Sequence, residues 1–301
     1  MELWIPITIG AAFVQNIRSS LQKHLRGTMG TAGATFVRFG FGVPFALLFL
    51  GLSLHATASS LPSLNVNFVG WIVLAALSQI IAQVLLIILF TRRNFAVGSA
   101  YVRTEPVLAA AFGVALLAET PSLAVMAAIA VSLAGVLLIS LAENKMSPRA
   151  VIGGLFSNAA ALGLGSAAIF GLAAVSFRAA SLSLGGPNFL VQGGVTLCVA
   201  IIVQSIILAV WILLRDPAEF GRIRGQWKTS ATVGFVGALA SFGWFTAMTL
   251  EQAALVKAVA QVEMLFAIAT TWLVFKERFS RRELLGCALI VSGVLLLIAL
   301  A

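Results

Sequence analysis

The sequence predicts an all-α integral membrane protein with ten transmembrane helices, arranged as two inverted repeats of five helices each. Three observations predict this fold. The 301-residue chain is 60% hydrophobic and only 10% charged, which is more apolar than a soluble domain of this length needs to be. Long runs with almost no charge recur along the whole chain. Residues 99–142 also align with residues 257–300 at a constant offset of 158.

Ten apolar segments are long enough to cross a membrane. A bilayer core of about 30 Å requires about 20 helical residues at about 1.5 Å each. The first segment has no basic region before it and no small-residue cleavage site after it, so we expect a membrane helix and not a cleaved signal peptide. The ten segments are residues 3–21, 31–53, 67–90, 95–117, 122–142, 151–177, 189–214, 229–250, 254–275 and 283–300.

The internal repeat divides the chain into two halves, residues 1–145 and 146–301, with five predicted helices each. Eleven of the 44 aligned positions are identical, including Glu105 with Glu263. A carboxylate in mid-membrane is costly, so its recurrence at the same position indicates a true repeat. Because five is an odd number, the second half enters the membrane from the opposite side, which makes the repeat inverted.

Lysine and arginine counts predict the orientation in the membrane. The odd-numbered loops, beginning with the loop between the first two helices, hold fourteen basic residues, whereas the even-numbered loops hold only Arg178. Cytoplasmic loops carry such an excess of basic residues. We therefore expect both termini outside the cytoplasm. This orientation explains the net charge of +9 more simply than binding of nucleic acid does.

The fourth and ninth predicted helices contain the strongest candidates for a polar site. Glu105 and Glu263 each lie about ten residues into their helix, near the middle of the bilayer. Tyr101 shares a face with Glu105, and Gln261 shares one with Lys257, because residues four apart lie on one side of a helix. Two explanations stay open. Either the acids form a substrate or proton site at the interface of the repeats, or each neutralises a nearby arginine or lysine and fixes helix packing.

Three arginines, Arg18, Arg38 and Arg103, also lie within predicted spans. Long basic side chains near a helix end can extend to the membrane surface. For Arg18 and Arg38, this explanation and a role in charge balance or gating are equally open. Arg103 lies deeper in its helix, and we expect it to face a cavity or to be paired.

Other polar side chains in the spans need partners, because hydrocarbon offers none. Interhelical hydrogen bonds and a shared wet cavity explain them equally well. Gln79 and Gln83, four residues apart, make the best case for a shared lining, and Trp244 is a candidate aromatic wall. The candidates for lining a cavity are therefore Gln15, Gln79, Gln83, Tyr101, Glu105, Asn158, Trp244, Lys257, Gln261 and Glu263.

Two prolines and a row of small residues predict local features of the helices. Pro44 and Pro106 lie inside apolar segments and should kink them or leave backbone carbonyls without a partner, and Pro106 directly follows Glu105. Gly163, Ala167 and Gly171 recur at four-residue spacing in the sixth helix. This spacing favours close packing against another helix of the same chain over a contact in a homodimer.

Several motifs resemble the EamA type of the drug/metabolite transporter superfamily. The second helix contains ATFVRFGFG, the fourth and ninth helices end in the acidic turns Ala118-Glu119 and Lys276-Glu277, and each repeat closes with Gly-Val-Leu-Leu. The resemblance covers essentially the whole chain. It implies a substrate cavity between the halves, lined by the first, third, fourth, sixth, eighth and ninth helices. The first helix departs from the family, because it shows FVQNIRSSLQ in place of the usual motif.

The resemblance implies a gradient-driven secondary transporter, an exporter or permease for a small metabolite in the inner membrane. The spans hold more cations than acids, which suits an amino acid or another carboxylate-bearing solute. No ATP-binding Gly-x-x-x-x-Gly-Lys-Ser/Thr motif is present, and Glu105 or Glu263 would carry the proton if protons are coupled. A lipid flippase of the same superfamily is the main alternative. The family is commonly drawn with cytoplasmic termini, whereas the charges here predict the reverse, and we follow the charges.

An integral-membrane enzyme that modifies lipids is a remote alternative. Such enzymes need clustered acids, histidines or metal ligands at a membrane face. This chain has one aspartate, Asp216, and two separated histidines. We therefore expect no enzymatic activity, no metal and no cofactor. A monomer suffices because one chain already contains both halves of the expected cavity, and a homodimer stays an alternative.

Overall fold

The computed structural model describes residues 2–25, 28–90, 100–143, 149, 156–186, 188–266, 268–269 and 280–300. Within these ranges the regular structure is helical, and eight helices are long and apolar enough to cross a membrane. They correspond to the second to eighth and the tenth predicted segments. The first segment forms a helix with several polar residues and is not among the eight. Much of the ninth segment, the Lys276-Glu277 turn and the starts of the fourth and sixth segments lie outside the described residues, so the number ten stays a prediction.

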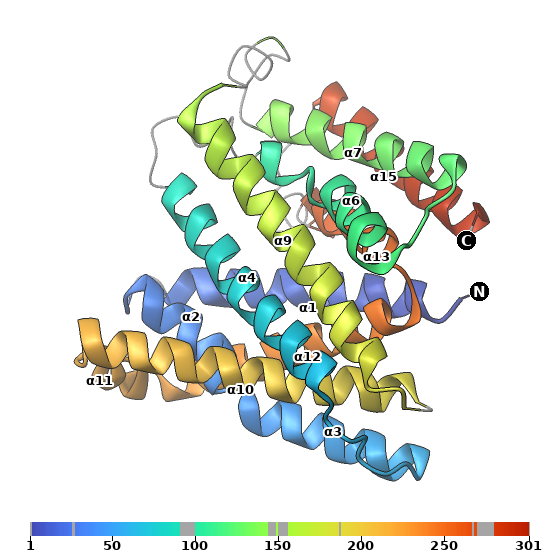
Figure 1. Cartoon of the computed structure of the whole chain (residues 1–301). Helices are drawn as coiled ribbons and strands as arrows, with labels where there is room; N and C mark the ends of the chain where they lie inside the picture. The colour runs from blue at the N-terminus through green and yellow to red at the C-terminus, as the bar shows by residue number, and fades with distance from the viewer. Residues whose placement is uncertain are drawn as a thin grey trace. The chain divides into compact units, whose positions relative to one another are not determined.

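The chain forms two compact units, whose helices are labelled in Figure 1. Unit 1 consists of Met1–Ala76 and Ser176–Leu250, and unit 2 consists of Leu77–Val175 and Glu251–Ala301. Each unit therefore combines segments from both halves of the sequence. Two long helices, α4 (Val66–Phe90) and α9 (Asn158–Ser183), contribute residues to both units.

In unit 1 the second predicted span consists of two helices, with a break at Phe41 and Gly42. Pro44 lies in the first turn of the second of these helices, where its missing N–H is not needed. The proline therefore has the local effect that the sequence predicted. The two helices of the second span are α2 (Thr31–Gly40) and α3 (Val43–Thr57), and unit 1 also contains α1 (Trp4–Leu25), α10 (Phe189–Arg215), α11 (Glu219–Gly225) and α12 (Trp227–Leu250).

Helices α3 and α10, which belong to the second segment of each half, run antiparallel. A Cβ atom at Gly42, before α3, would lie 2.6 Å from Ile201 Cδ1. A Cβ at Gly194 would lie 3.2 Å from Leu50 Cδ1. Contacts that advance along one helix while they retreat along the other define an antiparallel pair.

Unit 2 contains the last helix of each half, and these two helices also run antiparallel. A Cβ at Gly135 would lie 2.6 Å from the Gly286 carbonyl oxygen, and a Cβ at Gly293 would lie 2.6 Å from the Ser132 nitrogen. The repeated glycines therefore make room for the backbone of the facing helix. Figure 1 shows α7 and α15 side by side. The elements of unit 2 are α6 (Glu105–Leu117), α7 (Leu123–Glu143), α13 (Ala253–Val259), the 3₁₀ turn η1 (Ala260–Val262) and α15 (Arg281–Leu300).

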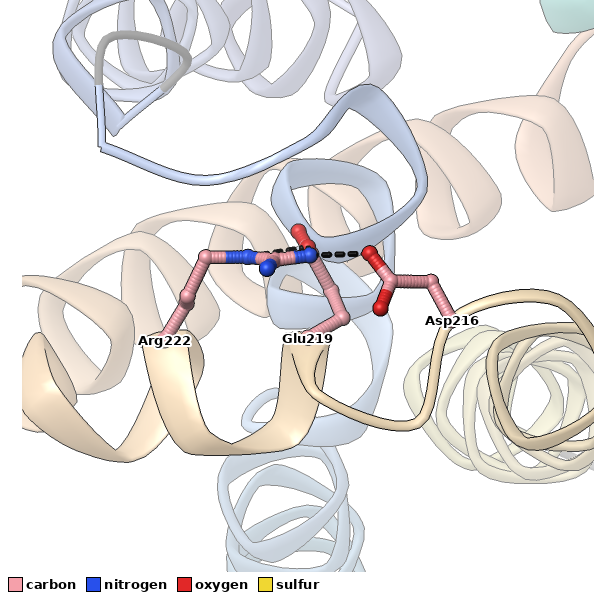
Figure 2. A network of polar contacts seen from close by, with 3 residues as sticks. All are labelled: Asp216, Glu219 and Arg222. Carbon is pink, nitrogen blue, oxygen red and sulfur yellow. Dashed lines mark hydrogen bonds and ion pairs between the residues drawn. The ribbon is translucent and has the colours of Figure 1, made fainter.

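The short helix α11 in unit 1 contacts the start of α2 through a buried acid, Glu219, which Figure 2 shows beside Arg222 and Asp216. Glu219 is only 2% exposed, and a Cβ added to Gly33 would overlap its Oε1 atom. An acid near a helix N-terminus is favoured by the helix dipole. Arg222 Nε donates to Glu219 Oε2 over 2.7 Å, and the same guanidinium pairs with Asp216. The carboxylates of Glu219 and then Asp216 accept these hydrogen bonds and raise the pKa of Arg222.

Candidate functional site

Unit 2 brings Glu105 and Lys257 together as an ion pair. Lys257 Nζ lies 2.8 Å from Glu105 Oε1, and the two side chains are 25% and 21% exposed. The acid comes from the first half of the sequence and the base from the second half, and α6 and α13 are in contact.

A turn before α6 and a 3₁₀ turn after α13 place these charges next to helix ends that favour them. A turn at Arg103 and Thr104 interrupts the fourth predicted span, and the Thr104 N–H donates to the Tyr101 carbonyl over 3.1 Å. Glu105 is the first residue of α6, and Pro106 lies in its first turn. The helix is therefore interrupted next to Pro106, as the sequence predicted. Lys257 lies in the last turn of α13, before the chain tightens into η1. An acid at the start of a helix and a base at the end of one are both stabilised by the helix dipole.

Other predicted site residues belong to the same two segments as the pair. Tyr101, one turn before Glu105, is buried at 8% exposure. Both amide atoms of Gln261 are buried and have no hydrogen-bond partner among the described residues. Glu263 is half-buried. Gln261 is four residues after Lys257, and its amide still has a donor and an acceptor to offer.

Helix α9 approaches the Glu105 helix closely in unit 2. A Cβ at Gly171 would lie 2.9 Å from the Ala109 nitrogen and 3.3 Å from its Cα. Gly171 therefore packs closely against another helix of the same chain, as its spacing predicted. The position of Glu105 therefore depends on a backbone contact that only glycine permits.

Unit 1 holds a second set of predicted residues. Trp244 Nε1 donates to Gln15 Oε1 over 3.0 Å, and Trp244 is only 7% exposed. The side chains of Arg18 and Arg38 both lie beside Gly237 of α12. A Cβ at Gly237 would lie 3.2 Å from Arg38 Cγ and 3.6 Å from Arg18 Cδ. The two arginines, which the sequence left as separate candidates, are therefore neighbours.

The remaining predicted residues differ in their exposure. Gln79 and Gln83 are half-buried, one turn apart on α4. Asn158 is exposed at the first residue of α9. Arg103 is exposed in the turn that precedes Glu105, and no described residue is recorded as its ion-pair partner. Among the described residues, no three His, Cys, Asp or Glu side chains gather as metal ligands.

Sequence reasoning missed two interactions. It compared Glu105 and Lys257 only with charges on their own helices, so it did not predict that the two would pair with each other. It also did not predict that Glu219 of α11, paired with Arg222, contacts the start of α2. The spacing of Asp216, Glu219 and Arg222, three residues apart, was the available signal, because such residues lie on one side of a helix.

The comparison with known families decides the class of this protein. The sequence profile of the EamA-like transporter family matches residues 2–141 and 157–299. The chain belongs to the EamA-like transporter family. The resemblance found in the motifs is thereby confirmed, and the protein is a multi-pass membrane protein of a transporter family. The two matched regions correspond to two EamA repeats.

A solved crystal structure shares the fold of this EamA-like protein. The two superpose with a TM-score of 0.71 at 17% sequence identity, over 99% of this chain and 98% of the other. Identity at this level indicates a common fold and nothing about substrate. No curated protein matches the sequence.

Proposed function

We propose that this chain is a gradient-driven secondary transporter of a small, carboxylate-bearing metabolite such as an amino acid. The ion pair between Glu105 and Lys257 supports this proposal more than any other observation. An amino acid has the same two charges as the pair. Its ammonium group can replace Lys257 at the Glu105 carboxylate, and its carboxylate can replace Glu105 at the Lys257 ammonium. A bound zwitterion would thus exchange one set of charge-assisted contacts for another.

The local backbone supports a binding role for this pair. Interrupted helices whose ends point at charged groups are a common way to build substrate sites in transporters. Here α6 begins at Glu105 and α13 ends two residues after Lys257. Both side chains keep about a quarter of their surface exposed, so a solute can reach them. The unsatisfied amide of Gln261 offers an additional polar contact.

The proposal includes an inverted arrangement of the two halves, 1–145 and 146–301. Antiparallel packing of α7 against α15, and of α3 against α10, supports it, because corresponding helices of inverted repeats run in opposite directions. We place both termini outside the cytoplasm of an inner membrane, following the distribution of basic residues. Reporter enzymes fused to the C-terminus, active only on one side of the membrane, test this orientation.

A charge-swap variant tests whether the pair binds substrate or only fixes packing. Glu105→Lys/Lys257→Glu keeps both charges and their attraction but reverses their positions. Metabolites in the medium and in cells are compared between the wild type and this variant, with equal amounts in the membrane. We expect the swap to lose transport and to remain folded, with a stability lower than that of the wild type by about 1–2 kcal/mol, because each charge then lies at the unfavourable end of its helix. Full transport by the swapped protein would show that the pair serves packing alone.

A second variant tests proton coupling. Glu263→Gln removes the ionisable group with little change of shape. We expect it to abolish uptake or export driven by a pH gradient in proteoliposomes, and full retention would exclude Glu263 as the proton carrier. If no polar metabolite differs between the wild type and a Glu105→Gln/Glu263→Gln variant, the flippase alternative gains support. Transfer of a fluorescent phospholipid between leaflets would then be the assay.

A further inference from the structure

Arg38 presents a charge that its own unit does not balance. Its Nε atom is buried and has no hydrogen-bond partner among the described residues. Its recorded contact is with the neighbouring Phe39 ring, whose centroid lies 4.9 Å from the guanidinium carbon. Arginine stays protonated in proteins, so Arg38 keeps its positive charge. A buried guanidinium therefore requires a negative partner.

The acids of unit 1 are engaged elsewhere. The segments of unit 1 contain only three acidic residues, Glu2, Asp216 and Glu219. Glu2 accepts a hydrogen bond from the Trp4 indole at the start of α1, and the other two pair with Arg222. None of these recorded contacts includes Arg38.

The nearest charged neighbour makes the requirement stronger. Arg18 runs beside Arg38 at Gly237, and its positive charge acts on Arg38. Arg38 does lie in the last turn of α2, where the helix end contributes about half a negative charge. That partial charge offsets only about half of the positive charge of one guanidinium. A net positive charge therefore remains beside Arg38.

We propose that Arg38 binds an oxyanion at this place in unit 1, at the crossing of α2 and α12. A guanidinium presents its N–H groups as a planar fork that matches a carboxylate or a phosphate. The Nε atom of Arg38 is buried, but the residue as a whole is only half-buried. An anion can therefore reach the guanidinium from its exposed side. The absent side chain of Gly237 lets α12 approach the stem of Arg38 closely, so a side chain added at position 237 would lie next to Arg38.

Two sources can supply this chemistry: a dissolved carboxylate or phosphate, and the phosphate of an anionic phospholipid. Arg38 is the eighth residue of its span, about 10 Å along the helix from its start at about 1.5 Å per residue. A long arginine side chain can bridge much of such a distance to a lipid headgroup. The proposal is independent of the transported substrate and of the Glu105–Lys257 pair.

A matched pair of substitutions at Gly237 tests the site without removing either arginine. Gly237→Asp supplies an internal carboxylate beside Arg38, and Gly237→Asn has the same shape without the charge. Thermal unfolding is measured in phosphatidylcholine nanodiscs, with sodium acetate or sodium phosphate added at an ionic strength held constant with sodium chloride. Parallel samples contain phosphatidylglycerol and no added oxyanion.

We expect the wild type and Gly237→Asn to unfold at higher temperature with one of the oxyanions, by about 3 °C or more. Gly237→Asp should already be more stable than Gly237→Asn and should not respond, and Arg38→Gln should also lose the response. A response to acetate or phosphate supports a dissolved ligand, and a response only to phosphatidylglycerol supports a lipid phosphate. Equal unfolding temperatures and equal responses of the Asp and Asn variants would overturn the proposal, whatever the result of the transport assays.

Discussion

The two units treat charge within the membrane in different ways. In unit 2, Glu105 and Lys257 meet at 2.8 Å, and each also lies at the favourable end of a helix. In unit 1, Arg38 has the favourable helix end but lies beside a second arginine. A helix end lowers the free-energy cost of burying a charge, but it does not remove that cost. The comparison teaches that an opposite charge is needed for that. Unit 2 supplies that opposite charge from its own sequence, and we infer that unit 1 takes it from outside.

The largest effect should follow from breaking the ion pair of unit 2 on one side. Lys257→Met leaves the Glu105 carboxylate without its partner, and we expect the free energy of unfolding to fall by about 3 kcal/mol. This is the lower end of the range for buried pairs, because both side chains keep some exposure. Denaturant unfolding in nanodiscs measures the loss. The double variant Glu105→Gln/Lys257→Met should recover most of it, and a double variant as unstable as the single one would argue against the pairing.

A smaller effect should follow from moving the helix next to Glu105. Gly171→Ala places a Cβ 2.9 Å from the Ala109 backbone nitrogen and must separate α9 from α6. We expect a loss of about 1–3 kcal/mol, as for other overpacked positions. Gly165→Ala is the matched control on the same helix, because its nearest neighbour would be Leu85 Cδ1 at 3.7 Å. Equal unfolding temperatures for these two variants would mean that the close contact does not constrain α6.

A substitution beside the buried acid Glu219 of unit 1 should lower the free energy of unfolding by less than the changes in unit 2. Gly33→Ala puts a Cβ into the position of the Glu219 carboxylate and should weaken the attachment of α11 to α2. We expect a loss of about 1–2 kcal/mol, because the displaced atom is the end of a side chain and not backbone. Gly221→Ala, which meets nothing within 4 Å, is the control and should cost nothing. Thermal unfolding compares the two, and a tolerated Gly33→Ala would show that Glu219 moves aside freely.

The smallest effect should come from the neutral hydrogen bond of unit 1. Trp244→Phe removes the indole donor to Gln15 and keeps most of the aromatic packing. We expect a loss of about 0.5–1.5 kcal/mol, the usual net value of one hydrogen bond. A double-mutant cycle with Gln15→Leu isolates the interaction, since the two losses should not add. Additive losses would mean that each side chain is stabilised by other contacts.

The class of the protein followed from the sequence alone. Apolar runs of membrane length and the repeated segments identified an all-helical membrane protein with two EamA repeats. Pro44 and Pro106 marked the places where helices break, because a proline lacks the N–H that continues a helix. The sequence also named Glu105, Lys257, Arg18 and Arg38 as residues of interest. These features are local, so the order of residues along one helix is enough to predict them.

Only the tertiary structure decided which of these charges meet. Helical spacing states on which face of its own helix a residue lies, but it does not state which other helix covers that face. Glu105 therefore had several candidate partners, and the contact between α6 and α13 selected Lys257. The same limit applies to Arg18 and Arg38, which become neighbours because both pass Gly237 of α12. Contacts between distant segments depend on how helices cross, and no periodicity within one segment contains that information.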